Sequence, residues 1–126
     1  MIGYVTLGTN DLPRAVAFYD ALMAELGARR IMETPQFVAW GTSMDQPGLA
    51  VTTPHDGQPA TVGNGVMVAL GVNDPATVDG VHAKALALGG TDEGAPGPRS
   101  DWFYAGYFRD PDGNKLNAFC LTGEMK

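Results

Sequence analysis

The chain has 126 residues, of which 44% are hydrophobic and 17% are charged, and its formal net charge is -6. This length matches one domain of ordinary size and excludes two large unrelated domains, and the apolar fraction suffices for a folded core. Eight Lys and Arg residues against fourteen Asp and Glu provide no basic stripe for a phosphate backbone, so nucleic acid is not an expected partner.

The first half of the chain predicts a strand, a helix and three further strands. Residues 4–9 form a β-rich run, and residues 10–13, Asn-Asp-Leu-Pro, follow as a helix start in which Asp11 is placed to cap and Pro13 is tolerated in the first turn. Apolar positions then recur every three or four residues from Leu12 to Leu26, and Gly27 provides a left-handed stop. Three short strands are predicted at residues 28–32, 36–41 and 48–53.

The second half repeats this order. Residues 54–65 are rich in Gly and Pro and predict a connector, after which residues 66–72 form an apolar strand. Asn73-Asp74-Pro75 opens a second helix that ends before Gly89-Gly90. Further strands are predicted at residues 91–95, 103–108 and 115–121, the last two joined by a tight turn at residues 110–113, Asp-Pro-Asp-Gly.

This internal repeat predicts an α+β fold made of two tandem β-α-β-β-β modules. Module one covers residues 1–53, the connector residues 54–65 and module two residues 66–126, within a single domain of residues 1–126. We expect the sheets to form a curled mixed sheet around a cup-shaped cavity, here called the cup, with one helix packed outside each module.

The sequence leads us to expect neither a membrane span nor a targeting segment. Its apolar runs are much shorter than the roughly 18 residues of a membrane span, and the N-terminus has no basic or cleavage-type segment. Cys120 lies between Phe119 and Leu121, which indicates a buried strand thiol and no internal disulfide. We therefore expect a cytoplasmic protein without a membrane partner.

Two segments carry a resemblance to a known family. Residues 4–19, with Tyr-Val-Thr-Leu, Asp-Leu-Pro-Arg-Ala and Phe-Tyr, and residues 108–114, Phe-Arg-Asp-Pro-Asp-Gly-Asn, resemble the opening and closing signatures of the vicinal-oxygen-chelate superfamily, which includes glyoxalases, bleomycin resistance proteins and dioxygenases. The resemblance spans the whole chain and implies a homodimer. It leaves function open, because the superfamily contains metal-dependent isomerases, dioxygenases and thiol transferases as well as metal-free drug-sequestering proteins.

The resemblance also implies where metal ligands would stand. In metal-using members, His, Glu or Gln residues of the first and last strands of each module point into the cup, and the matching positions here are Tyr4, Met67, Asn117 and a residue near Val51. A phenol, a thioether and a carboxamide are poor ligands for Zn²⁺ or Fe²⁺. We therefore expect no metal and no other cofactor.

Catalytic groups are equally hard to identify. His55 lies in the connector and His82 beside the apolar stripe of the second helix, so solvated or helix-packing roles are expected of both. The acidic residues near the C-terminus fall in predicted loops or in the tight turn, and no acid/base pair is evident.

The predicted ligand-binding residues are aromatic, apolar or small and polar. They are Tyr4, Thr6, Trp40, Val51, Met67, Tyr104, Tyr107, Asn117 and Phe119. Either of two alternating sets in residues 103–108 could face the cup, and the sequence leaves this open. Arg99 and Trp102, in a predicted loop at residues 94–101 and just after it, could close the mouth, with Arg99 either receiving an anionic group or simply solvated, the latter being favoured.

Three functions fit these features. The first is a metal-free small-molecule-binding protein that holds an amphipathic or aromatic ligand in the cup. The second is a metal-dependent lyase, isomerase or dioxygenase of the glyoxalase type, which needs a base that the sequence does not reveal. The third is a structural subunit that pairs through its sheet edges.

Overall fold

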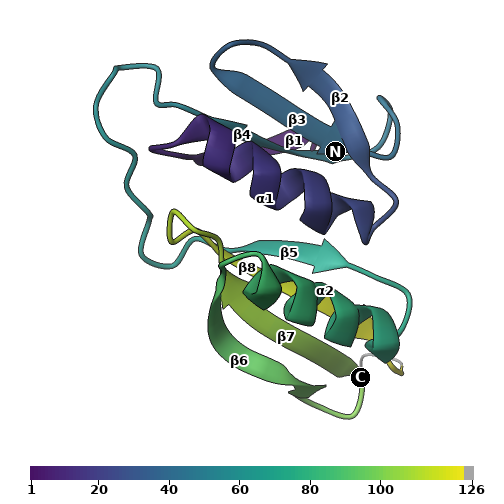
Figure 1. The fold of residues 1–126 in the computed structure, drawn as a ribbon. Helices are drawn as coiled ribbons and strands as arrows, with labels where there is room; N and C mark the ends of the chain where they lie inside the picture. Colours follow the sequence, from purple (N-terminus) through teal and green to yellow (C-terminus); the bar gives the residue numbers. More distant parts are fainter. Residues whose placement is uncertain (124–126) are drawn as a thin grey trace. The chain divides into compact units, whose positions relative to one another are not determined.

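The computed structural model describes residues 1–123, in two compact units that divide between Gly63 and Asn64 (Figure 1). The first unit contains β1 (Tyr4–Gly8), α1 (Leu12–Ala24), β2 (Arg29–Glu33), β3 (Phe37–Gly41) and β4 (Gly48–Thr52). The second contains β5 (Val68–Gly71), α2 (Pro75–Ala87), β6 (Thr91–Pro98), β7 (Phe103–Arg109) and β8 (Lys115–Leu121). The predicted order of elements is confirmed in both halves.

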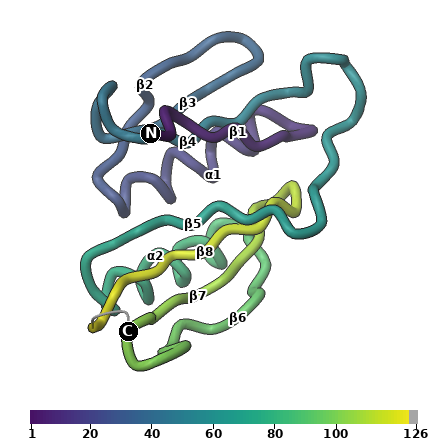
Figure 2. Tube along the Cα trace, turned by 180° about the vertical axis from the view of Figure 1, so that it is seen from behind, coloured from purple at the N-terminus to yellow at the C-terminus, as the bar shows by residue number. Residues whose placement is uncertain are grey.

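Each unit has a four-stranded mixed sheet with one helix on one face. The strand order is β1-β4-β3-β2 in the first sheet and β5-β8-β7-β6 in the second, and in each the first strand of the module runs parallel to the last. The remaining pairs are antiparallel. Figure 2, seen from behind, shows the strands of the second unit in front of α2. We call the face opposite the helix the open face of each sheet.

The helix ends follow the predicted sequence signals. Asp11 accepts a hydrogen bond from the backbone N–H of Arg14 (3.1 Å), and Asp74 accepts one from Thr77 (2.8 Å). These carboxylates satisfy donors that a helix start leaves unpaired. Gly27 adopts a φ of 72° just after α1, as its predicted role as a left-handed stop requires.

The core of each unit lies between helix and sheet. The buried residues of α1 are Ala15, Phe18, Tyr19, Leu22 and Met23, and those of α2 are Val78, Val81, His82 and Ala85. Both sets repeat at helical spacing and cover one face of the helix. This leaves the open face of each sheet without a helix of its own unit.

Two strands differ from the prediction. β5 begins at Val68, so Met67 precedes the strand and is 41% exposed. β6 continues to Pro98, past the predicted end at residue 95, because it is an edge strand in which prolines interrupt no ladder on the outer side. Its register shifts around Gly94 and Gly97.

The connector is attached to the first unit. The Asn10 side chain donates to the Ala60 carbonyl (3.1 Å) and accepts from the Ala60 N–H (2.7 Å). Residues 54–63 of the predicted connector accordingly group with the first unit. No helix within residues 1–123 has the length and apolar character to cross a membrane.

Candidate functional site

In the first sheet, register assigns Trp40 and Val51 to the helix side. Trp40 is 1% exposed, lies 5.6 Å from the Tyr19 ring of α1 (centroid to centroid), and donates from Nε1 to Asp20 Oδ1 at 2.8 Å. Val51 pairs with Val38, two residues along β3 from Trp40, and so shares that face. The expectation that Trp40 and Val51 face the cup does not fit this placement, and we do not include either in the candidate site.

Tyr4 and Thr6 lie on the open face of the first sheet. Tyr4 is 60% exposed, and its ring meets Phe37 of β3 edge to face with centroids 6.0 Å apart. Ala50, on the intervening strand β4, pairs with Thr6 and is fully buried. This face therefore offers two aromatic rings over a floor of small side chains.

The positions that would hold a metal carry unsuitable donors. Ala50 pairs with Thr6 as Asn117 pairs with Ala69, so Ala50, one residue before the predicted Val51, is the counterpart of Asn117. The set is then a phenol, a methyl, a thioether and a carboxamide, which does not fit a divalent transition metal. Within residues 1–123, no three His, Cys, Asp or Glu side chains are grouped to hold a metal ion.

In the second sheet, one hydrogen bond and one ring contact with α2 resolve the orientation of β7. The Tyr104 hydroxyl donates to Asp79 of α2 at 2.7 Å, and the Phe108 ring meets His82 of α2 edge to face. Tyr104 and Phe108 therefore face the helix. Alternation turns Phe103 and Tyr107 to the open face, where Tyr107 pairs with Asn117. Of the two predicted tyrosines on β7, only Tyr107 belongs to the candidate site.

Three aromatic rings are in contact at one end of this open face. The rings of Phe103 and Phe119 stack with centroids 5.3 Å apart and planes at 16°. The Trp102 ring meets Phe103 edge to face at 5.7 Å. All three side chains are only half-buried, so they present apolar surface that the second unit itself does not cover.

Polar groups surround Tyr107 at the other end. The Arg99 guanidinium carbon lies 5.3 Å from the Tyr107 ring centroid, and the Lys115 Nζ lies 5.6 Å from it. Next to Tyr107, Asn117 is 2% exposed and its Oδ1 has no hydrogen-bond partner within the described residues. A buried acceptor without a partner is costly, and it is a feature expected where a ligand or water supplies the donor. The candidate site is this open face of the second sheet.

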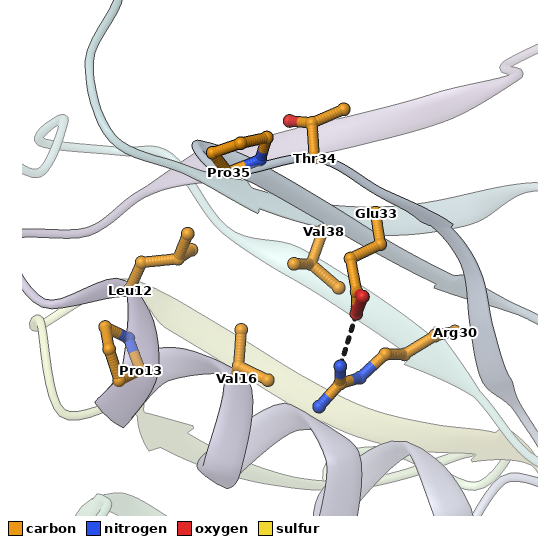
Figure 3. Close-up of a pocket in the computed structure, with 8 residues that line it drawn as sticks. All are labelled: Leu12, Pro13, Val16, Arg30, Glu33, Thr34, Pro35 and Val38. Carbon is orange, nitrogen blue, oxygen red and sulfur yellow. Dashed lines mark hydrogen bonds and ion pairs between the residues drawn. The ribbon is translucent and has the colours of Figure 1, made fainter.

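A cavity of about 570 Å³ lies elsewhere, on the helix side of the first sheet (Figure 3). Leu12, Pro13 and Val16 of α1 face Val38 across it, and Arg30 and Glu33 of β2 lie at its side as an ion pair. Arg30 also forms an ion pair with Asp20. The charged side chains that line this cavity are thus already in ion pairs. They are not available to bind a ligand.

The one histidine–carboxylate pair in the described residues is structural. His82 is 6% exposed, and its Nε2 lies 3.0 Å from Asp92 Oδ1 on β6. The Gly94 N–H and then His82 hold the pKa of Asp92 below its usual value. The pair links α2 to β6 on the helix side, which confirms the predicted helix-packing role of His82. His55 is exposed in the connector.

Sequence reasoning missed Phe37 and Lys115 as parts of the open faces, and it left open whether the set with Phe103 or the set with Tyr104 faces the cup. Phe37 and Phe103 lie in strands that have apolar residues on both faces. The sequence alone therefore does not show which face of the sheet their side chains occupy. The signal for Lys115 was available, since it lies in phase with Asn117 and Phe119 on β8.

The comparisons with known proteins agree with this fold. The family model described as the glyoxalase/bleomycin resistance protein/dioxygenase superfamily matches residues 1–118. A crystal structure of a glyoxalase/bleomycin resistance protein from Albidiferax ferrireducens is 39% identical with a TM-score of 0.87, covering 95% of this chain and 98% of that chain. No curated protein matched.

More distant structures share the fold alone. A glyoxalase/bleomycin resistance protein/dioxygenase family enzyme from Burkholderia phytofirmans is 20% identical with a TM-score of 0.75, covering 94% of this chain and 97% of that chain. A structure described as lactoylglutathione lyase from Agrobacterium tumefaciens is 23% identical with a TM-score of 0.68, covering 95% and 92%.

Proposed function

Because the chain belongs to the glyoxalase/bleomycin resistance protein/dioxygenase superfamily, we propose that it binds an amphipathic or aromatic small molecule without a metal ion. The proposed site is the open face of the second sheet. The observation that carries the proposal is the stacked pair Phe103 and Phe119, half-buried beside the unpartnered Oδ1 of Asn117. Apolar surface with a few convergent polar groups is the usual composition of a small-molecule site.

The energetics support a planar ligand. An aromatic side chain can bury on the order of 150 to 250 Å², so stacking a ligand on the Phe103–Phe119 pair would provide several kcal/mol before the costs of association. Asn117 would accept a hydrogen bond from an N–H or O–H of the ligand and so orient it. The open face of the first sheet, with Tyr4, Thr6 and Phe37, is a second apolar surface for the same ligand class.

A metal-dependent lyase, isomerase or dioxygenase is the alternative. It has the fold-level likeness to the Agrobacterium lactoylglutathione lyase in its favour. Against it stand the donor set of Tyr4, Ala50, Met67 and Asn117 and the position of His82–Asp92 on the helix side. Homodimer formation and a cytoplasmic location remain predictions.

Binding of the neutral fluorescent probe phenylnaphthylamine tests the proposal. We expect fluorescence enhancement that saturates, and a loss of affinity of roughly 5- to 30-fold in Phe119→Ala, corresponding to the 1 to 2 kcal/mol of a lost aromatic contact. Tyr104→Phe is the matched control, because Tyr104 lies in the same sheet but faces α2. Equal affinity in the wild type and in Phe119→Ala would contradict the proposed site.

A further inference from the structure

The open face of the second sheet has a positive charge that contrasts with the rest of the chain. Lys115 and Arg109 are register partners on β8 and β7, and Arg109 Nε donates to Glu93 at 2.8 Å. Arg99 and Lys115 form no ion pair with a carboxylate in the part of the chain that the structure describes. In a protein of net charge -6, two unpaired cations beside one aromatic ring are a local reversal of sign.

The Arg99 side chain is held in place by two carbonyls of β6, the strand that it follows. Nη1 donates to the Gly97 carbonyl at 2.9 Å, and Nη2 donates to the Ala95 carbonyl at 2.7 Å. Arginine has five N–H donors, so these two bonds fix the plane of the guanidinium and leave further donors for a ligand. Arg99 follows the end of β6, yet the side chain folds back far enough to reach Tyr107.

Two glycines make this path possible. A Cβ at Gly97 would lie 3.3 Å from Arg99 Nη1, and a Cβ at Gly94 would lie 3.4 Å from Arg99 Nη2 and 3.3 Å from Tyr107 Cδ1. Gly97 and Gly94 pair with Ala105 and Tyr107, both on the open face. Because glycine has no Cβ, these two positions leave the space in which the Arg99 guanidinium lies against the sheet.

We infer that Arg99 and Lys115 form an anion-binding subsite over Tyr107, so that the ligand of this face is a planar aromatic molecule with an acidic group, a carboxylate or sulfonate. The inference rests on the proposed function and specifies its ligand class. The aromatic body lies on Phe103 and Phe119, and the acidic group binds to the cations that flank the Tyr107 ring. Charge-assisted hydrogen bonds from a preorganised guanidinium are stronger than neutral ones, and Arg99 provides them without an ordering step.

Two fluorescent probes that differ by one sulfonate test the inference. Anilinonaphthalene sulfonate carries the acidic group, and phenylnaphthylamine lacks it. We expect Arg99→Gln and Lys115→Gln each to weaken binding of the sulfonate probe by roughly 5- to 20-fold and to change binding of the neutral probe by less than about 2-fold. Binding of the sulfonate probe should also weaken as ionic strength rises.

A positioning variant separates charge from placement. Gly97→Ala keeps both cations, but its Cβ would lie 3.3 Å from Arg99 Nη1 and so shifts the guanidinium by a few tenths of an ångström; it should weaken sulfonate binding by about 2- to 3-fold and leave the neutral probe unaffected. Gly80→Ala on α2 is the control, because a Cβ there meets no atom within 4 Å. Two outcomes would contradict the inference. If Arg99→Gln and Lys115→Gln weaken binding of both probes equally, or weaken binding of neither probe, the inference is wrong while the proposed function stands. If neither probe binds the wild type, the proposed function fails and the inference fails with it.

Discussion

The indole nitrogen of Trp40 donates a hydrogen bond of 2.8 Å to Asp20, which joins an inner strand of the first sheet to the C-terminal half of α1. Asp20 Oδ1 also accepts from Arg30 Nε at 2.9 Å. One carboxylate thus connects the helix to two neighbouring strands, β2 and β3. The largest side chain in the core of this unit is therefore part of a polar network and is remote from the open face.

Trp40→Phe is expected to lower stability and to leave ligand binding unchanged. The variant loses the hydrogen bond to Asp20 and part of the indole volume, which should reduce the free energy of unfolding by about 1 to 3 kcal/mol. Urea unfolding measures this loss, and phenylnaphthylamine titration should give an affinity within about 2-fold of wild type. Weakened binding without lost stability would return Trp40 to the ligand site.

Asp20 should make stability depend on pH. The hydrogen bond from Arg30, and then that from Trp40, hold the pKa of Asp20 below its usual value of 3.8, against the opposing effect of burial. A folded-state pKa below the unfolded one stabilises the fold above the unfolded pKa, and this contribution is lost as pH falls through the folded pKa. At neutral pH, Asp20→Asn should therefore lower the free energy of unfolding by about 1 kcal/mol, a modest figure because the side chain is 40% exposed.

The same comparison at low pH provides the control. As the pH falls below 3.8 toward the lowered pKa of Asp20, the difference between wild type and Asp20→Asn in urea unfolding should shrink. Other carboxylates titrate in both proteins and cancel in the difference. A stability gap that stays constant from pH 7 to pH 3 would show that Asp20 acts through its shape and not through its charge.

The fold could be predicted because its signals are local and occur twice. Asp11 and Asp74 cap their helices, and Gly27 and Gly89 adopt the positive φ that ends them. A repeated pattern of this kind constrains topology strongly, since each module must bury the same helix face on the same sheet.

The site could be predicted only in part. The sequence shows which face of a strand a side chain occupies only where the residues of one face are polar. On β8 the alternation of Leu116, Ala118 and Cys120 with Asn117 and Phe119 separates the two faces. On β3 both phases are apolar, and Trp40 was assigned to the wrong face for that reason. The folding back of Arg99 onto Tyr107 depends on tertiary contacts that no local pattern encodes.

Protein purified without added metal should contain little divalent ion. The candidate positions carry phenol, methyl, thioether and carboxamide groups, so we expect less than about 0.1 divalent ion per chain by elemental analysis. His55→Ala and His82→Ala should not change this value, because His55 is exposed in the connector and His82 packs on the helix side. One ion per chain that survives dialysis would favour the metal-dependent alternative.

Asn117→Leu should raise stability while it weakens binding. The Oδ1 of Asn117 is buried and has no partner among residues 1–123, a state that costs about 1 to 3 kcal/mol relative to a satisfied or apolar group of similar size. Leucine is close in volume, so urea unfolding should show equal or greater stability, by up to about 1 kcal/mol. The variant also removes the only acceptor that we assign to the ligand, so a probe with an amide N–H, such as naphthamide, should bind less tightly to it than to wild type.

Asn117→Asp is the companion variant, because it keeps an acceptor but adds a charge in a buried position, and it should lose stability instead. Were Asn117→Leu to unfold more easily than wild type, Asn117 would have a structural partner and its role in ligand binding would lose its main support.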